Sequence, residues 1–408
     1  MKNTIFRGLV LFALMTITLT VVAQDGEGGE VPRTGFRPDA PTYGIRGEYP
    51  VGTMDMMIED EERPLPVTIW YPALNLDGLP EVHNYPVMYP PVLPPLEVFG
   101  AALFEAEPDV ENGPYPLVIF SHGFTTFRTQ NSFFAEHLAS WGFVVMAPDH
   151  IDMTVGNFGN DPATFYPMYY NTPQDVSRTI DFAESINADG IMAGMIDMEH
   201  IAAAGHSSGG FTALQAVGGQ LDLAGLLALC EEREGASFDC PHAVPEAEAL
   251  AALYGLDGVP DDLLPAIGDD RIDAIIPLAP DQVFFGETGL NNVTVPTLYI
   301  VGNQDEYIPF DEFETGFSSL GSETAYMVEF DYGGHGMFQD TCERYPALVS
   351  FGLYSLCGEV VWDKLRAHDI TNHYATSFLL WQLTDDEAAA AVFGDTPETF
   401  PGVEVIMP

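Results

Sequence analysis

The feature that most limits the fold is an alternation of short, continuous apolar runs with segments of helical spacing. Such runs are typical of parallel strands that are buried on both faces, and they lie at 116–123, 143–150, 201–207, 271–280 and 294–302. Segments of helical spacing fall between or after them, at 129–142, 173–187, 208–219 and 369–383. The alternation predicts an α/β fold, a mostly parallel sheet with helices on both faces.

The first residues resemble an export signal. Lys2 and Arg7 stand before and at the start of an apolar run that ends in small residues at Ala23. Cleavage after a signal peptide at 1–23 is expected, which places the mature protein in a secreted or periplasmic compartment. The alternative is retention of the run as a single membrane anchor. A Gly-, Pro- and Glu-rich segment follows at 24–45, and we expect it to be a flexible leader.

The rest of the chain is predicted to form one domain, 46–408. It begins with two antiparallel strands over 49–73, joined by a charged turn, and continues with a Pro-rich excursion over the surface at 76–112. A Leu-, Ala- and Glu-rich helical stretch interrupts the alternation at about 220–270, and we interpret it as an inserted cap.

Charge and cysteine content narrow the partners. The chain has 13 basic against 61 acidic residues, a formal net charge of −48, so nucleic acid and anionic lipid are not expected to bind. Four cysteines in an exported protein favour disulfides, and three pairings are possible. Local pairing, Cys230 with Cys240 and Cys342 with Cys357, is the simplest. A zinc site is the alternative, but no CxxC element is present.

The strongest local motif is Gly205-His206-Ser207-Ser208-Gly209, between a predicted strand and a predicted helix. G-x-S-x-G in this position is typical of a nucleophile elbow, a sharp turn that lifts a serine hydroxyl above the sheet. The flanking glycines are needed because side chains there would collide with neighbouring elements. Ser207 is therefore the candidate nucleophile.

A serine nucleophile needs a base, and His335 is the best placed of the 10 histidines. It stands between glycines in a loop after the last predicted strand, downstream of Ser207, as the order Ser, Asp, His requires. The other histidines are expected to have structural or solvated roles, and those of His122 and His206 are structural parts of their motifs. The set is His83, His122, His137, His150, His200, His206, His242, His368 and His373.

The acid that orients the base has two candidates. Asp305 follows a buried strand 30 residues before His335 and is favoured. Asp281 also follows a strand and is the alternative, while Glu306 stands next to Asp305.

The oxyanion of the intermediate needs two N–H donors. We expect one from Ser208 and one from Phe124, in the turn that His122 and Gly123 shape after the first parallel strand. An aromatic-rich loop over 158–170 is expected to line the substrate pocket, with packing on its own side chains as the alternative. The residues concerned are Phe165, Tyr166, Met168, Tyr169 and Tyr170.

The segments "PLVIFSHGFTTFRTQNSFFAEHLASWGFVVMAPDH" and "AAAGHSSGG" resemble the platelet-activating-factor acetylhydrolase and dienelactone-hydrolase-like branch of the α/β-hydrolases. Cutinase-like polyesterases and chlorophyllases are similar more distantly. The resemblance covers 45–340 in pattern and is close around 115–150 and 200–212. It implies the α/β-hydrolase fold, Ser207 and His335 as nucleophile and base, and no cofactor.

Two departures leave questions open. In the acetylhydrolases the acid follows the strand after the nucleophile helix, which favours Asp281, whereas the common arrangement favours Asp305. Dienelactone hydrolases use cysteine as nucleophile, so Ser207 argues against that reaction. The sequence thus predicts a serine hydrolase of small or lipid-like carboxylic esters, without metal. The alternatives are an open-site polyesterase or lipase, and a non-catalytic binding protein of the same fold.

Overall fold

The computed structural model describes residues 34–87, 96–157, 161–233, 237, 239–350, 352, 354 and 357–407. The predicted signal peptide, 1–23, lies outside the described residues. The strands are β1 (Val51–Ile58), β2 (Leu65–Pro72), β3 (His83–Val87), β4 (Leu96–Gly100), β5 (Leu103–Phe104), β6 (Tyr115–Ser121), β7 (Val144–Pro148), β8 (Ile196–His206), β9 (Ala274–Leu278), β10 (Thr297–Gly302), β11 (Ala325–Phe330) and β12 (Val403–Ile406).

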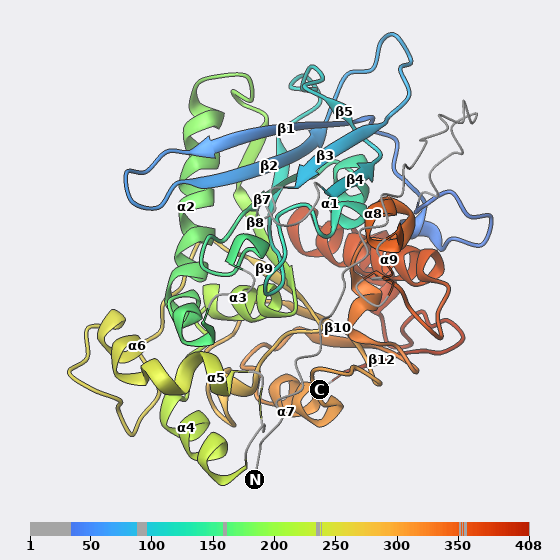
Figure 1. The fold of residues 1–408 in the computed structure, drawn as a ribbon. Coiled ribbons are helices and arrows are strands. Elements are labelled where there is room, and N and C mark those ends of the chain that lie inside the picture. Colours follow the sequence, from blue (N-terminus) through green and yellow to red (C-terminus); the bar gives the residue numbers. More distant parts are fainter. Residues whose placement is uncertain are drawn as a thin grey trace, which may run out of the picture. The chain divides into compact units, whose positions relative to one another are not determined.

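Helices follow most of the parallel strands (Figure 1). The α-helices are α1 (Ser132–Ser140), α2 (Met168–Ala188), α3 (Ser208–Ala216), α4 (Leu223–Glu232), α5 (Cys240–Ala243), α6 (Ala247–Leu253), α7 (Phe310–Ser318), α8 (Pro346–Ser350), α9 (Lys364–Thr384) and α10 (Glu387–Ala390). Short 3₁₀ turns are η1 (Thr42–Gly44), η2 (Val155–Asn157), η3 (Pro162–Phe165), η4 (Val244–Glu246), η5 (Val283–Phe285), η6 (His335–Phe338), η7 (Cys342–Arg344) and η9 (Ala391–Phe393).

The central sheet has 10 strands in the order β12-β11-β10-β9-β8-β6-β7-β2-β1-β5. The strands from β7 to β11 pair in parallel, and β1, β2 and β12 add antiparallel pairs toward the edges. Every residue of β6, β7, β9 and β10 is buried, which explains their continuous apolar sequences. The predicted α/β class is confirmed.

The helices cover the sheet on two sides. In Figure 1, α1 and α9 lie to one side of the central strands and α2 and α3 to the other, and each pair is in contact. This double cover is why the parallel strands are buried on both faces. Parallel strands end at the same edge, so the turns after β6, β8, β9, β10 and β11 share that edge.

Helix α2 begins earlier than the sequence predicts. We expected Pro173 to open this helix, but α2 starts at Met168 and contains Pro173. Proline has no N–H to give to the carbonyl four residues back, that of Tyr169. That carbonyl accepts instead from Gln215 Nε2 and Tyr254 Oη, each at 2.8 Å. The helix therefore continues through the proline because distant side chains satisfy the carbonyl.

The described parts of the segment 76–112, residues 76–87 and 96–112, are more ordered than a surface excursion. The strands β3 and β4 form a separate two-stranded antiparallel sheet. Tyr85 of β3 is buried, accepts a hydrogen bond from Trp70 Nε1 and donates one to Glu136 Oε1 of α1, at 2.7 and 2.9 Å. An anchored tyrosine hydroxyl thus ties this segment to the main sheet and to α1.

The described part of the predicted leader, 34–45, also differs from a flexible chain. The Gly35 N–H donates to Asp369 Oδ1 of α9 at 2.6 Å, and η1 packs against the same helix. Contacts with α9 therefore fix this part.

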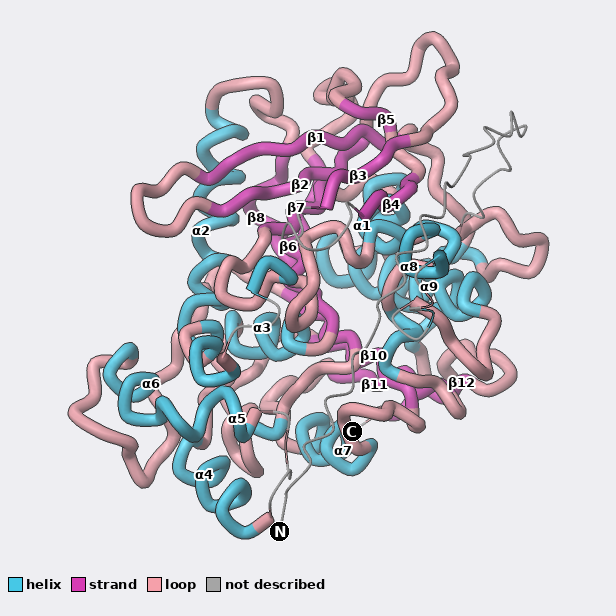
Figure 2. Tube along the Cα trace, in the orientation of Figure 1, coloured by secondary structure: helices cyan, strands magenta, loops and turns pink. Residues whose placement is uncertain are grey.

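The predicted interruption at about 220–270 holds α4, α5, η4 and α6, which lie together in yellow in Figure 1 and as short helices joined by loops in Figure 2. A disulfide joins Cys230 of α4 to Cys240 of α5, and a second joins Cys342 to Cys357. These are the two local pairs that the sequence favours. Among the described residues, none of the helices combines the length and apolar character needed to cross a membrane.

Buried carboxyl groups should make stability depend on pH. Burial raises the pKa of Glu312 and of Asp369 to about 7, and that of Asp340 to about 6. The folded state then holds protons that the unfolded chain has lost, so this contribution is complete below about pH 4 and is lost as the pH rises through 6 to 7. Buried histidines act in the opposite direction, because burial lowers the pKa of His137 to about 3 and that of His122 and His373 to about 4. We therefore expect a fall between about pH 4.5 and 7 in the difference in unfolding free energy between the wild type and Asp369→Asn, which isolates one carboxyl group.

Urea unfolding at both pH values in 1 M NaCl, which screens surface repulsion, measures this change. Asp395→Asn, at an exposed position, is the matched control, and its difference from the wild type should stay constant. A difference between the wild type and Asp369→Asn that stays constant or rises over this range would contradict the account.

Candidate active site

Ser207 stands in the turn between β8 and α3. Its backbone has φ 59° and ψ −123°, a conformation that residues other than glycine rarely adopt. A Cβ on Gly205 would collide with the carbonyl of Gly209, and one on Gly209 would collide with the carbonyl of Ser121. The glycines are therefore required for the close approach of β8, α3 and β6, as the motif predicts for a nucleophile elbow.

His335 and Asp305 are joined by a hydrogen bond of 2.6 Å between Nδ1 and Oδ2. Both side chains are nearly or fully buried, with 7% and 0% of their areas exposed. The other oxygen of Asp305 accepts from the backbone N–H groups of Tyr307 and Ile308, at 2.8 and 2.9 Å. Glu306, adjacent to the acid, accepts from the backbone N–H of His335. The carboxylate is thus fixed in position. The Nδ1 atom of His335 is used by this contact, which leaves Nε2 as the ring nitrogen that can serve as a base.

The elbow and the His335 loop are packed together through His206, the residue before Ser207. The rings of His206 and His335 lie 4.7 Å apart between centroids, and His206 Nε2 donates to the carbonyl of His335 at 3.1 Å. Burial lowers the pKa of His206 well below its usual value, so the ring stays neutral. His206 thus contacts the His335 loop directly, and the imidazole of His335 lies beside the elbow.

Asp281, the alternative acid, has a different partner. Its side chain is hydrogen-bonded to that of Asp239, which also accepts from Tyr169 Oη at 2.5 Å. Burial and the neighbouring charge of Asp239 raise the pKa of Asp281 well above its usual value. The Asp281 backbone N–H donates to the carbonyl of Ser207 at 3.2 Å. Asp281 therefore lies at the elbow, but as a protonated member of a carboxyl pair.

The predicted oxyanion donors belong to the start of α3 and to the turn after β6. Ser208 is the first residue of α3, directly after the nucleophile. Gly123 faces the elbow, because a Cβ built on it would lie 3.4 Å from the Cβ of Ser207. Phe124, the residue after Gly123, supplies the second predicted N–H. The turn after β6 is thus adjacent to the nucleophile.

Only part of the predicted aromatic wall meets this turn. The ring of Phe165 lies 4.8 Å from that of Phe124. Tyr169 is buried with its hydroxyl on Asp239, and Tyr170 packs on Tyr254. Tyr166 is partly buried against the core. Phe165 is therefore the member of the set that packs against the predicted oxyanion turn.

His242 is the residue here that sequence reasoning missed. We expected an ordinary satisfied or solvated role, yet its ring lies 4.9 Å from Phe124 and 5.5 Å from Phe165. It belongs to α5, which the disulfide at Cys240 attaches to α4. The only sequence signal was its position two residues after that cysteine.

The fold and this arrangement define the chain as an α/β-hydrolase-fold protein. The structure is similar to that of a ferulic acid esterase from Streptomyces cinnamoneus, with a TM-score of 0.57 and 19% identity, over 92% of this chain and 99% of that chain. At this identity the likeness shows the fold.

Within this fold the chain resembles the platelet-activating factor acetylhydrolases, as its motifs predict. A family model described as platelet-activating factor acetylhydrolase, isoform II, matches residues 100–157, which include β6, the turn after it, α1 and β7. The platelet-activating factor acetylhydrolase of Canis lupus familiaris is 30% identical over 137 residues. That match spans 29% of this chain and 29% of the dog protein.

The two aspartates can be separated by substitution. We expect Asp305→Asn to lower kcat toward an acetyl ester by about 10³- to 10⁴-fold, because the imidazole loses the carboxylate that fixes its tautomer and stabilises its charged form. Asp281→Asn should keep kcat within about tenfold, since an amide resembles the protonated acid in shape. Steady-state kinetics of the two variants measure this. The reverse order would assign the acid to Asp281, as in the acetylhydrolases.

Proposed function

We propose that this chain is an exported serine hydrolase of carboxylic esters, acting on acetyl-type or other short acyl groups, including those of phospholipid-like substrates. The observation that carries the proposal is the Asp305–His335 hydrogen bond, whose imidazole packs against the residue preceding a strained serine. The resemblance to platelet-activating factor acetylhydrolases supports the substrate class.

The proposed first step forms an acyl-enzyme. Ser207 Oγ attacks the ester carbonyl carbon while His335 Nε2 takes the hydroxyl proton, and Asp305 stabilises the resulting imidazolium. The N–H groups of Phe124 and Ser208 bind the oxyanion of the tetrahedral intermediate. The intermediate then collapses, the bond to the alcohol oxygen breaks, and His335 returns the proton to the leaving alcohol.

The second step releases the acid. Water attacks the acyl carbon while His335 Nε2 takes one of its protons, giving a second tetrahedral intermediate in the same oxyanion site. Collapse breaks the bond to Ser207 Oγ, which recovers its proton from His335. One ester and one water thus give one alcohol and one carboxylic acid, and no cofactor is consumed.

The cap supports a preference for small esters over polymers. His242 of α5 and Phe165 pack against Phe124 at the predicted oxyanion turn, so aromatic rings stand where a long chain would enter. A polyester hydrolase needs an open surface at this place. We therefore favour a single-chain or small ester as substrate.

Covalent labelling tests whether the chain is an enzyme or a binding protein. A fluorophosphonate should label the wild type at Ser207, because an activated serine displaces the fluoride, and Ser207→Ala should lose both label and esterase activity. Ser318→Ala, at an exposed serine of α7, is the control. Peptide mapping by mass spectrometry locates the label. Labelling at another residue, or an unlabelled wild type, would contradict the proposal.

A chain-length panel tests the proposed acyl pocket. We expect kcat/KM to fall from acetyl toward dodecanoyl p-nitrophenyl esters. Phe165→Ala should raise the ratio of octanoyl to acetyl activity by about tenfold, since removing a ring from a hydrophobic wall makes room for methylene groups. Phe104→Ala, an exposed phenylalanine of β5, is the control. An unchanged ratio for Phe165→Ala would remove this residue from the acyl pocket.

A further inference from the structure

A second hydrogen-bonded series of serine, histidine and aspartate runs from the end of β6 to α2. Ser121 Oγ at the end of β6 is 3.0 Å from His150 Nε2, and His150 Nδ1 is 3.1 Å from Asp175 Oδ2 on α2. None of the three residues has more than 1% of its area exposed. A substrate carbonyl cannot reach a hydroxyl buried to this extent, so this series has another role than nucleophilic attack.

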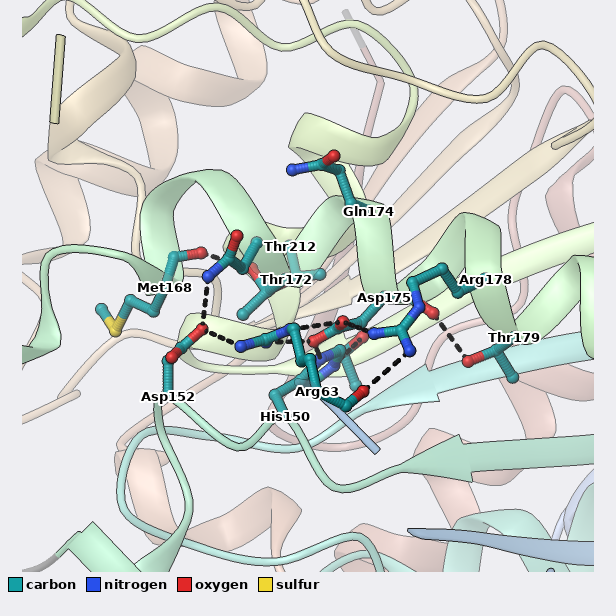
Figure 3. A network of polar contacts seen from close by, with 12 residues as sticks. Arg63, His150, Asp152, Met168, Thr172, Gln174, Asp175, Arg178, Thr179 and Thr212 are labelled. Atoms are coloured by element: carbon teal, nitrogen blue, oxygen red, sulfur yellow. Dashed lines mark hydrogen bonds and ion pairs between the residues drawn. The ribbon is translucent and has the colours of Figure 1, made fainter. Parts of the chain in front are cut away.

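Two arginines hold Asp175 as a carboxylate (Figure 3). Arg63 contacts it at 2.6 Å through Nη2 and at 3.1 Å through Nε, and Arg178 Nη1 at 3.2 Å. Arg63 also pairs with Asp152. Burial favours the neutral acid, but hydrogen bonds from His150 and Arg63 outweigh it and lower the pKa of Asp175. A carboxylate can only accept, so Nδ1 of His150 carries the proton that this contact uses.

The carboxylate fixes the tautomer of the His150 ring, and the His150 backbone fixes that of His122. The other ring nitrogen of His150, Nε2, lies 3.0 Å from the hydroxyl of Ser121, which can donate to it. The backbone N–H of His150 donates to His122 Nε2 at 3.1 Å, so His122 carries its proton on Nδ1, 2.8 Å from the carbonyl oxygen of Gly123. Burial lowers the pKa of His122 to about 4, which keeps this ring neutral at pH 7. The hydroxyl of Ser121 and Nδ1 of His150 thus donate in the direction of Asp175, whereas the backbone N–H of His150 and Nδ1 of His122 donate in the direction of the turn after β6.

The series ends on the peptide between Gly123 and Phe124. The Gly123 carbonyl accepts from His122 Nδ1 and from the backbone N–H of Thr126, at 2.8 and 3.3 Å. In a planar trans peptide the C=O and the N–H point in opposite directions. Fixing the carbonyl of Gly123 therefore fixes the direction of the Phe124 N–H, in a turn that lies against Ser207.

We propose that His150 and Asp175 are positioning residues that aim the Phe124 N–H at the oxyanion formed on Ser207. The inference rests on the proposed function, because it assigns the second oxyanion donor to that same site. A donor stabilises the transition state without reorganisation only when it is already aimed. Loss of this alignment should therefore lower kcat and leave ground-state binding nearly unchanged.

The test uses Asp175→Asn and Ser121→Ala, with p-nitrophenyl acetate as substrate and a trifluoromethyl ketone as inhibitor. The ketone forms a hemiketal on Ser207 and places its oxyanion between the same donors. We expect kcat to fall about tenfold and the inhibition constant to rise by about the same factor, with KM changed by less than about twofold. Thermal unfolding confirms that each variant is folded.

Thr179→Val is the matched control. Thr179 lies on α2, is buried, and donates to the backbone carbonyl of Asp175 at 2.7 Å (Figure 3), without a place in the series to Gly123. Its kcat and inhibition constant should match those of the wild type. A loss caused by general loosening of α2 would affect this variant too and would overturn the inference.

The outcomes separate the two proposals. A wild type without esterase activity would overturn the proposed function and this inference with it. An active wild type, with folded variants that keep both kcat and the inhibition constant, would overturn the positioning role alone. A rise in KM at constant kcat would overturn it as well. Should Asp175→Asn fail to fold, Ser121→Ala decides, because it removes only the hydroxyl of the series.

Discussion

The strained backbone of Ser207 is the constraint around which the central strands are arranged. A positive φ at a serine persists only when its surroundings enforce it. Here β8 lies between β6 and β9, and the glycines at 205 and 209 let α3 and β6 approach the turn closely. The same parallel order puts the ends of β10 and β11 at this edge. Asp305 and His335 follow those two strands, so the strand order explains why residues from distant parts of the sequence meet.

Features that rest on local sequence patterns were predictable. Continuous apolar runs predicted β6 to β10, and the glycine pattern around Ser207 predicted the elbow, because burial on two faces and steric contact leave clear compositional traces. The parallel strand β11, which is not buried throughout, was not predicted. His335 and Asp305 each follow a strand, and a side chain after a parallel strand reaches the shared edge. The pattern was not sufficient to separate Asp305 from Asp281, which also follows a strand. That difference depends on Asp239, the residue before α5, which no pattern links to Asp281.

Features that rest on contacts between distant elements were not predictable. Pro173 reads as a helix start, and only Gln215 and Tyr254 explain how α2 continues through it. His150 was expected to be ordinary, because its partners, Ser121 and Asp175, lie on two other elements. A polar group without a partner is costly in the interior, so each of these buried groups has one. The partners are close in space but distant in the sequence, and no local pattern predicts them.

The central claim is that Ser207 and His335 act as one unit, and comparing single and double variants tests it most directly. The quantity to measure is kcat/KM toward an acetyl ester for Ser207→Ala, His335→Ala and the double variant. Groups that work in the same step give non-additive losses. The kcat/KM of the double variant should therefore stay within about threefold of that of the less active single variant. Losses that multiply in the double variant would show two independent contributions and contradict the account.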